Sequence, residues 1–304
     1  MKKQIFLGLC LALLLCLLIQ PQKAHALTAL ETEKECCLTL HYVQDGVGFA
    51  DLPVRVYRVA EAFADGSFEL IAPFSGYPVN IHGVTSQTEW QQIASTLNAY
   101  ISAEQIAPSK TETTDANGTA VFSNLQTGLY LVCGVMAENQ NGIYRFNDFM
   151  VYLPTPRSDG SFNYDIDAIP KCSKFTPHTQ YSVVKLWKDA GNEEIRPQAV
   201  TVDILKDGVL QQTVILNGEN NWSYSWTAPQ DQGVWTVVEK DVPDAYGVSI
   251  VEKDGKFIIT NTSTNPGKPP QTGDIFPVWM LTVVLCVSGL ALVLMGIWRE
   301  RKHG

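Results

Sequence analysis

Short apolar runs separated by polar turn signals fill the middle of the chain. The runs are rich in β-branched and aromatic residues, and Asp-Gly or Asn-Gly pairs punctuate them. Short strands with turns at this spacing predict antiparallel sandwiches, and therefore an all-β fold class. The clearest runs are Leu52–Val59, Gly128–Cys133, Val200–Leu205, Gln212–Leu216, Val234–Val238 and Phe257–Asn261.

A polar stretch divides this strand-rich region. It covers Ser173–Gln180, has little apolar content and contains Pro177. We therefore predict two Ig-like β-sandwich domains in tandem, the first over residues 27–175 and the second over residues 181–262.

One segment of the first domain has a helical pattern instead. Ser86 followed by Glu89 forms a capping box, which marks a helix start. The apolar residues that then fall on one helical face are Trp90, Ile93, Leu97 and Tyr100. We predict an amphipathic helix over Gln87–Ser102, inserted between strands and packed against a sheet.

The N-terminal end has the three parts of a secretory signal. Lys2 and Lys3 precede the apolar run Ile5–Ile19, and the A-x-A cleavage site Ala24-His25-Ala26 follows. We predict a signal peptide over residues 1–26, because the run is short for a membrane span of roughly 20 residues. An uncleaved anchor helix is the alternative.

The C-terminal end predicts a membrane anchor. Ile275–Trp298 carries no charged residue and is long enough to cross a bilayer. The basic tail at residues 299–304 predicts a cytoplasmic C-terminus, with everything before Ile275 outside the cell.

The short linker before this helix, residues 263–274, contains a recognisable motif. The motif is Pro269-Pro270-Gln271-Thr272-Gly273. Motif, apolar helix and basic tail in this order resemble the sorting signal of Gram-positive surface proteins, which a sortase cleaves between Thr and Gly. The resemblance implies cleavage between Thr272 and Gly273, a transient stay in the membrane, and covalent attachment to peptidoglycan or to other subunits. The family usually has Leu where this chain has Pro269, which leaves the class of sortase open.

The charge balance narrows the possible functions. The 304 residues carry a formal net charge of −9, and 17% of them are charged. An acidic chain without a basic stripe gives no footprint for nucleic acid. No nucleophile elbow, phosphate loop or paired-carboxylate motif occurs, and the histidines are too scattered for zinc. We therefore expect no enzyme, no metal and no cofactor.

The second domain carries the most specific combination of motifs. These are Val184-Lys185-Leu186-Trp187, Trp235-Thr236-Val237-Val238-Glu239 and Phe257-Ile258-Ile259-Thr260-Asn261-Thr262. Together they resemble the B-type repeat of collagen adhesins and of Gram-positive pilins. In that family a first-strand Lys and a last-strand Asn join in a spontaneous isopeptide bond, assisted by a buried Glu. The resemblance implies these roles for Lys185, Asn261 and Glu239.

The reaction needs these residue types. A Lys amine is a nucleophile only when neutral, and burial near apolar groups such as Trp187 lowers its pKa. A buried Glu239 would stay protonated and polarise the amide of Asn261. The alternative is a surface pair of Lys185 with Glu239, and an Asn that merely ends a strand.

The first domain resembles the N-terminal domain of pilin subunits. The motifs that carry this resemblance are Leu38-Thr39-Leu40-His41, Asn117–Val132 and Ile169-Pro170-Lys171. In pilins the Lys of the last motif accepts the Thr carboxyl of the next subunit, which implies Lys171 as the acceptor. A solvated linker lysine is the alternative, and Lys174 is close enough to substitute.

The crosslinking residues themselves are missing from the first domain. Tyr42, Gly134 and Cys172 stand where such domains have Lys, Glu and Asn.

The exported part keeps four cysteines, which are Cys36, Cys37, Cys133 and Cys172. The compartment is oxidising, and adjacent residues of a strand face opposite sides, so Cys36 and Cys37 should not pair with each other. In the pilin domains that this domain resembles, the first and last strands are neighbours. The resemblance therefore implies a disulfide from Cys36 or Cys37 to Cys172. Free thiols are the alternative, and the pairing of Cys133 stays open.

Two functions remain open. The first is a pilus subunit, backbone or basal, that sortase attaches to the cell wall; the second is a monomeric wall-anchored adhesin with a host or matrix ligand. Two sandwiches of strands about 10 residues long reach less than about 100 Å. A Gram-positive wall is generally thicker, so the length favours the subunit.

Overall fold

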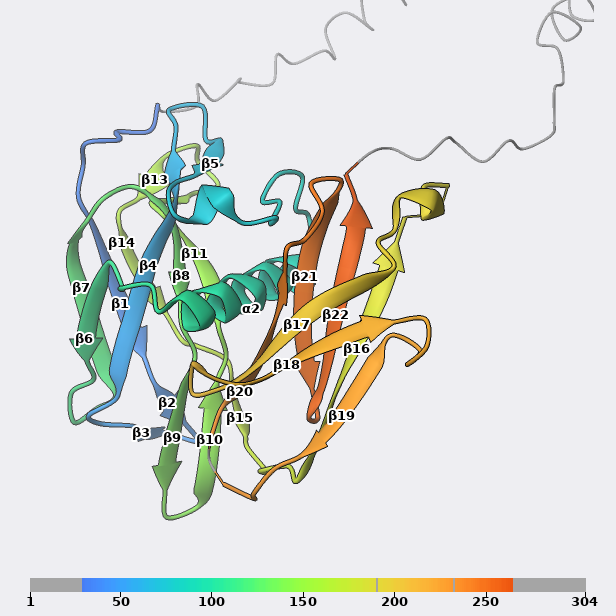
Figure 1. Cartoon of the computed structure of the whole chain (residues 1–304). Coiled ribbons are helices and arrows are strands. Elements are labelled where there is room, and N and C mark those ends of the chain that lie inside the picture. The colour runs from blue at the N-terminus through green and yellow to red at the C-terminus, as the bar shows by residue number, and fades with distance from the viewer. Residues whose placement is uncertain (1–28, 190, 232, 265–304) are drawn as a thin grey trace, which may run out of the picture. The chain divides into compact units, whose positions relative to one another are not determined.

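The computed structural model describes residues 29–264 except for residues 190 and 232, and these belong to one compact unit (Figure 1). Two β-sandwiches follow each other along the chain, and one long helix, α2, accompanies the first. The predicted signal peptide, sorting motif, transmembrane helix and basic tail lie outside the described residues. No helix in the described part is long and apolar enough to span a bilayer.

The first sandwich is built from short strands. They are β1 (Cys36–His41), β2 (Val43–Gln44), β3 (Val47–Gly48), β4 (Pro53–Ala62), β5 (Phe68–Leu70), β6 (Lys110–Thr113), β7 (Thr119–Leu125), β8 (Gly128–Val132), β9 (Val135–Asn139), β10 (Gly142–Phe146), β11 (Phe149–Leu153), β12 (Thr155–Pro156), β13 (Phe162–Asn163), β14 (Asp165–Ala168) and β15 (Cys172–Lys174). The main sheets have the orders β14-β1-β7, β15-β10-β9 and β11-β8-β4-β5, with β6 paired to β4. All these pairs are antiparallel except β1 with β14.

The second sandwich has two sheets. Its strands are β16 (Gln180–Lys188), β17 (Ala199–Lys206), β18 (Val209–Asn217), β19 (Ser223–Thr227), β20 (Trp235–Lys240), β21 (Tyr246–Lys253) and β22 (Lys256–Ser263), with the short 3₁₀ helix η2 (Glu193–Ile195). The sheets have the orders β19-β16-β22-β21 and β18-β17-β20. The first and last strands, β16 and β22, are parallel neighbours, while the other pairs are antiparallel.

Two predicted turns have the expected conformation. Asp207-Gly208 and Asp254-Gly255 join β17 to β18 and β21 to β22, and all four residues have positive φ between 51° and 75°. Two consecutive residues with positive φ give the turn whose twist matches paired strands, and Gly and Asp tolerate this conformation.

The predicted helix is confirmed as α2 (Gln87–Glu104), which follows the short 3₁₀ helix η1 (Phe74–Gly76). Ser86 Oγ accepts the N–H of Glu89, and the Glu89 carboxylate accepts the N–H of Ser86, so the capping box forms. The helix has two apolar faces. Ile93, Ala94, Leu97 and Ile101 pack into the first sandwich, whereas Ala99 and Tyr100 belong to the core of the second.

The predominantly β, Ig-like architecture with one helix agrees with the prediction. Tyr100 lies on the predicted side of the helix, but its ring packs in the core of the second sandwich, whereas Ile93 and Leu97 pack in the first. At 100° per residue, Tyr100 lies only about 20° around the helix from Ile93, and it reaches the second core because it lies about two turns further along the axis. The exact domain boundaries stay a prediction.

Candidate functional site

Three polar side chains meet inside the second sandwich. Lys185 lies on β16, Asn261 on the neighbouring strand β22, and Glu239 on β20 of the opposite sheet. All three residues are at most 3% exposed. Alternation along each strand turns them inward, because each follows a buried apolar residue two positions earlier. These apolar residues are Val183, Val237 and Ile259.

Glu239 contacts both of the other side chains. Its Oε1 accepts a hydrogen bond from Asn261 Nδ2 at 2.8 Å, and its Oε2 lies 3.6 Å from Lys185 Nζ. Lys185 Nζ donates to the carbonyl of Leu186 at 3.0 Å and lies 3.9 Å from the centroid of the Trp187 ring. Within the described part of the chain, Glu239 Oε2 and Asn261 Oδ1 have no hydrogen-bond partner.

Burial shifts both titratable groups toward their neutral forms. Desolvation lowers the pKa of Lys185 to about 8, against the opposing attraction of the Glu239 carboxylate. Desolvation likewise raises the pKa of Glu239, although Lys185 and the Asn261 hydrogen bond pull it down. The site therefore brings together a lysine with a lowered pKa, a carboxyl with a raised pKa, and an asparagine side-chain amide that is hydrogen-bonded to this carboxyl.

This arrangement has the parts of an amide-exchange reaction. A neutral Lys185 amine can attack the side-chain carbonyl carbon of Asn261, while a protonated Glu239 polarises that carbonyl and passes a proton to the leaving nitrogen. The three residues singled out in the sequence are thus brought together, and the surface-pair alternative for Lys185 and Glu239 does not fit their burial.

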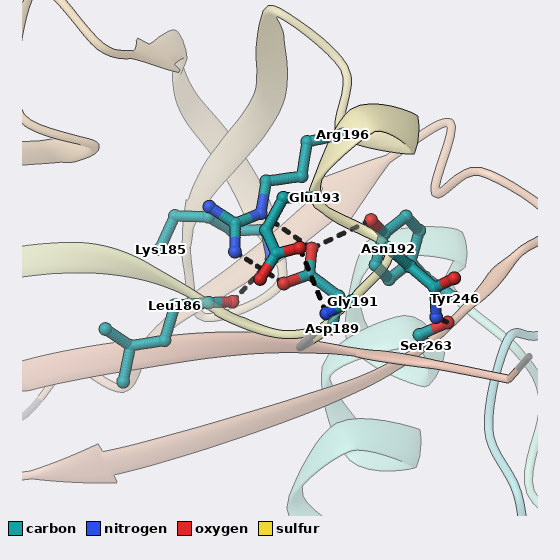
Figure 2. A network of polar contacts seen from close by, with 9 residues as sticks. All are labelled: Lys185, Leu186, Asp189, Gly191, Asn192, Glu193, Arg196, Tyr246 and Ser263. Carbon is teal, nitrogen blue, oxygen red and sulfur yellow. Dashed lines mark hydrogen bonds and ion pairs between the residues drawn. The ribbon is translucent and has the colours of Figure 1, made fainter. Parts of the chain in front are cut away.

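A network of polar contacts around Asp189, Arg196 and Tyr246 lies next to Lys185 and Leu186 (Figure 2). Asp189, which is 3% exposed, accepts from Arg196 Nε at 2.6 Å and from the Tyr246 hydroxyl at 2.9 Å. The rings of Trp187 and Tyr246 meet edge to face with centroids 5.2 Å apart. The network therefore fixes the aromatic ring against which the Lys185 amine lies.

We expect Asp189→Asn to lower the free energy of unfolding at pH 7 by about 2 kcal/mol, less than for a fully buried ion pair because Arg196 is one-third exposed. The Arg196 hydrogen bonds lower the pKa of Asp189, so its stabilisation is fully present above the unfolded value of about 4 and is lost gradually as the pH falls through the lower folded pKa. Urea unfolding should show a larger difference from wild type at pH 7 than at pH 3. The exposed Asp244→Asn is the control, and an equal loss at both pH values would contradict this role.

The predicted acceptor Lys171 lies on the surface of the first sandwich. It is exposed between β14 and β15, after the buried Pro170. Lys174 is also exposed, at the end of β15. Lys171 and Lys174 are thus accessible to solvent, whereas Lys185 is buried.

The four cysteines of the described residues, Cys36, Cys37, Cys133 and Cys172, are free thiols in the structure. Cys36 is buried on β1, where desolvation raises the pKa of its thiol to about 11. Cys172 lies on β15, which pairs with β10, whereas the parallel neighbour of β1 is β14. The disulfide to Cys172 therefore stays a prediction without support from strand pairing.

The fourth thiol belongs to a polar cluster in the first sandwich. Cys133 Sγ lies 3.2 Å from Asn98 Oδ1, and Asn98 Nδ2 donates to Asp148 Oδ1 at 2.9 Å. The N–H of Gly134 donates to the same carboxylate oxygen at 2.7 Å. Burial raises the pKa of both Cys133 and Asp148, so this thiol is a hydrogen-bonded core group.

Sequence reasoning missed Asp189 and the second face of α2. Nothing in the spacing of the sequence links Arg196 to an aspartate in the preceding loop. Among residues 29–264, omitting 190 and 232, no group of His, Cys, Asp or Glu is arranged to hold a metal ion.

Comparison with known families agrees with both resemblances. Residues 181–262 match the Cna protein B-type domain, and residues 40–173 match the Gram-positive pilin subunit D1, N-terminal domain. The two matches cover separate segments of the chain, so one segment is similar to each kind of domain. It is also 34% identical over 153 residues to the collagen adhesin of Staphylococcus aureus, which covers 44% of this chain and 13% of that protein.

Solved structures of such proteins are similar to the chain at low identity. A single B repeat unit of the collagen-binding surface protein of Staphylococcus aureus is 18% identical, covers 76% of this chain and 99% of its own, and has a TM-score of 0.27. The full-length major pilin of Corynebacterium diphtheriae is 11% identical, with 78% and 99% covered and a TM-score of 0.27. The basal pilin of Lactobacillus rhamnosus GG is 14% identical, with 47% and 99% covered and a TM-score of 0.26.

Proposed function

We propose that this protein is a structural subunit of a Gram-positive surface pilus, backbone or basal, that sortase attaches covalently and that an internal Lys185–Asn261 isopeptide bond stabilises. The observation that carries the proposal is the buried contact of Glu239 with both partners of that bond. The pilin D1 match over residues 40–173 supports the subunit role.

The bond forms in one irreversible step per molecule. The neutral Lys185 amine adds to the Asn261 side-chain carbonyl carbon, and the new C–N bond replaces the bond to the amide nitrogen. Glu239 protonates that nitrogen, which leaves as ammonia, and recovers a proton from the Lys185 nitrogen. The protein is changed by the reaction and does not turn over, so this is self-modification.

The position of the bond suits a protein under tension. Load enters the second sandwich at β16 and leaves it at β22, which are parallel neighbours. Pulling the N-terminal end of one against the C-terminal end of the other shears the two strands. A bond between Lys185 and Asn261 joins them near their C-terminal ends, so residues 186–260 lie outside the load path.

A wall-anchored adhesin is the second candidate. It is favoured by the 34% identity to the collagen adhesin, which covers 44% of this chain. It shares the crosslink and the sortase anchor with the first candidate, and the two differ in whether the anchored protein polymerises.

The proposal is tested by the intact mass of residues 27–268 after complete reduction of thiols. We expect a mass about 17 Da below that of the sequence, which is the ammonia lost on amide formation. Peptide mapping should then find one branched peptide that joins the segments around Lys185 and Asn261. A mass equal to that of the sequence would remove the crosslink from the proposed function.

A further inference from the structure

The second sandwich is open along one side, and α2 of the first sandwich covers it. β20 and β21 are the end strands of their sheets, and α2 lies against both (Figure 1). On β21, the N–H of Ile250 donates to Thr96 Oγ1 at 2.8 Å, and the N–H of Val248 donates to the carbonyl of Pro78 at 2.7 Å. The first sandwich thus satisfies backbone groups that an uncovered edge strand would leave exposed.

The residues of α2 that face the second sandwich are as buried as residues of a hydrophobic core. Thr96 is fully buried, Ala99 is 2% exposed and Tyr100 is 6% exposed. Ala99 and Tyr100 pack in the same apolar cluster as Val237 and Ile259, the residues that flank Glu239 and Asn261 along their strands. Tyr77, from the loop before the helix, stacks on Tyr100 with ring centroids 4.5 Å apart.

Tyr100 reaches the surroundings of Glu239. Its hydroxyl is buried and, among the described residues, has no hydrogen-bond partner, as is also true of Glu239 Oε2. Desolvation raises the pKa of Tyr100, and the next largest contribution is the negative charge of Glu239. Tyr100 also packs in one buried cluster with Val237, which lies two residues before Glu239 on the same face of β20, and α2 lies against that strand.

We propose that Tyr100 is a positioning residue for the crosslinking reaction, so that the first sandwich completes the reaction chamber of the second. This inference rests on the proposed function, because it concerns the same Lys185–Asn261 bond. The ring closes the gap between β20 and β21 and keeps water from Glu239 and Lys185. With water admitted, both groups ionise more readily, and a protonated Lys185 cannot attack Asn261.

A helix that completes the reaction chamber imposes an order of events. The crosslink forms after α2 has docked, so a chain whose two sandwiches are not yet assembled stays open. The covalent bond then stabilises the conformation that the second sandwich has when α2 is docked on it.

The test follows the rate of ammonia loss in chains of residues 27–268 made by cell-free synthesis, quenched over time and weighed. Tyr100→Ala should react about tenfold more slowly than wild type at pH 7, as expected if the pKa of Lys185 returns upward by about one unit. Tyr100→Phe keeps the ring and should stay within about twofold of wild type. Ile93→Ala removes a buried side chain of α2 that packs in the core of the first sandwich, and it controls for loss of helix packing.

The pH profile separates positioning from mere stability. The rate of wild type should rise with pH through the pKa of Lys185, which is about 8, as the amine loses its proton. In Tyr100→Ala this rise should move to higher pH by about one unit, so that its defect shrinks at pH 9. Ile93→Ala should keep the wild-type profile.

The outcomes are distinct. If wild type never loses ammonia, the proposed crosslink fails and this inference fails with it. If wild type reacts and Tyr100→Ala reacts at the same rate with the same profile, the crosslink stands and the inference is overturned. An equal slowing of Tyr100→Ala and Ile93→Ala, without a shift in profile, would also overturn it.

Discussion

Glu239→Ala is expected to yield a folded chain that keeps its full sequence mass and unfolds at a much lower temperature. Without the carboxyl, no group polarises the Asn261 carbonyl or protonates the departing nitrogen, so the amine of Lys185 stays unreacted. The missing bond would have closed residues 185–261 into one loop. By analogy with a disulfide of that loop length, its loss costs about 4 kcal/mol.

This stability loss should appear as a decrease in melting temperature of about 10 °C for a unit of this size. Differential scanning calorimetry and intact mass on the same samples measure both effects. A Glu239→Ala chain that still loses ammonia would show that another group assists the reaction.

Val237→Ala is the matched control for this variant. Val237 lies two residues earlier on the same face of β20 and is fully buried. Its truncation leaves a cavity and should cost about 1–3 kcal/mol, yet the chain should still weigh about 17 Da less than its sequence. Loss of stability with the crosslink retained would separate core packing from chemistry. If Val237→Ala also keeps full mass, the Glu239→Ala result reports packing alone.

Most of the secondary structure could be predicted because local signals and tertiary packing agree. The capping box at Ser86 and Glu89 fixes the start of α2, and Asp-Gly pairs mark turns that need positive φ. Strands such as β17 and β22 coincide with apolar runs of the sequence. Such signals lie within a few residues of each other, so the sequence displays them directly.

The candidate site was accessible only through resemblance. Composition and spacing favour an exposed Lys185, since lysine is almost never fully buried without a partner. Its burial follows from the pairing of β16 with β22 and from the opposite sheet, which place Asn261 and Glu239 around it. These contacts connect residues distant in sequence, and no local pattern encodes them.

The contacts of α2 show the same limit. A helical wheel assigns Tyr100 to one apolar stripe, but which surface covers that stripe depends on a domain that begins much later in the chain. Thr96 is likewise a polar residue within the apolar pattern of the helix. In the structure it is fully buried, and its hydroxyl accepts the N–H of Ile250. The strand order also could not be predicted from the sequence: the parallel neighbour of β1 is β14 and not β15.

In the native host, blots of the wall fraction are expected to show a ladder of high-mass species that resists boiling in detergent. Sortase cleavage after Thr272 would leave an acyl-enzyme that needs an amine, and Lys171 offers one from the exposed segment between β14 and β15. Pro170, the residue before Lys171, restricts the backbone there. The interior Lys185 is excluded as an acceptor by its burial.

Lys171→Ala should abolish this ladder and leave wall-anchored monomer, because wall precursor still supplies an amine to the acyl-enzyme. Lys174→Ala, three residues away and also exposed, is the matched control and should keep the ladder. Deletion of residues 270–273 should remove both ladder and anchored monomer. A ladder lost only in Lys174→Ala would move the acceptor to that residue. A wild type that gives monomer alone would refute the polymerising subunit and leave the stand-alone adhesin, since the two candidates differ in this one step.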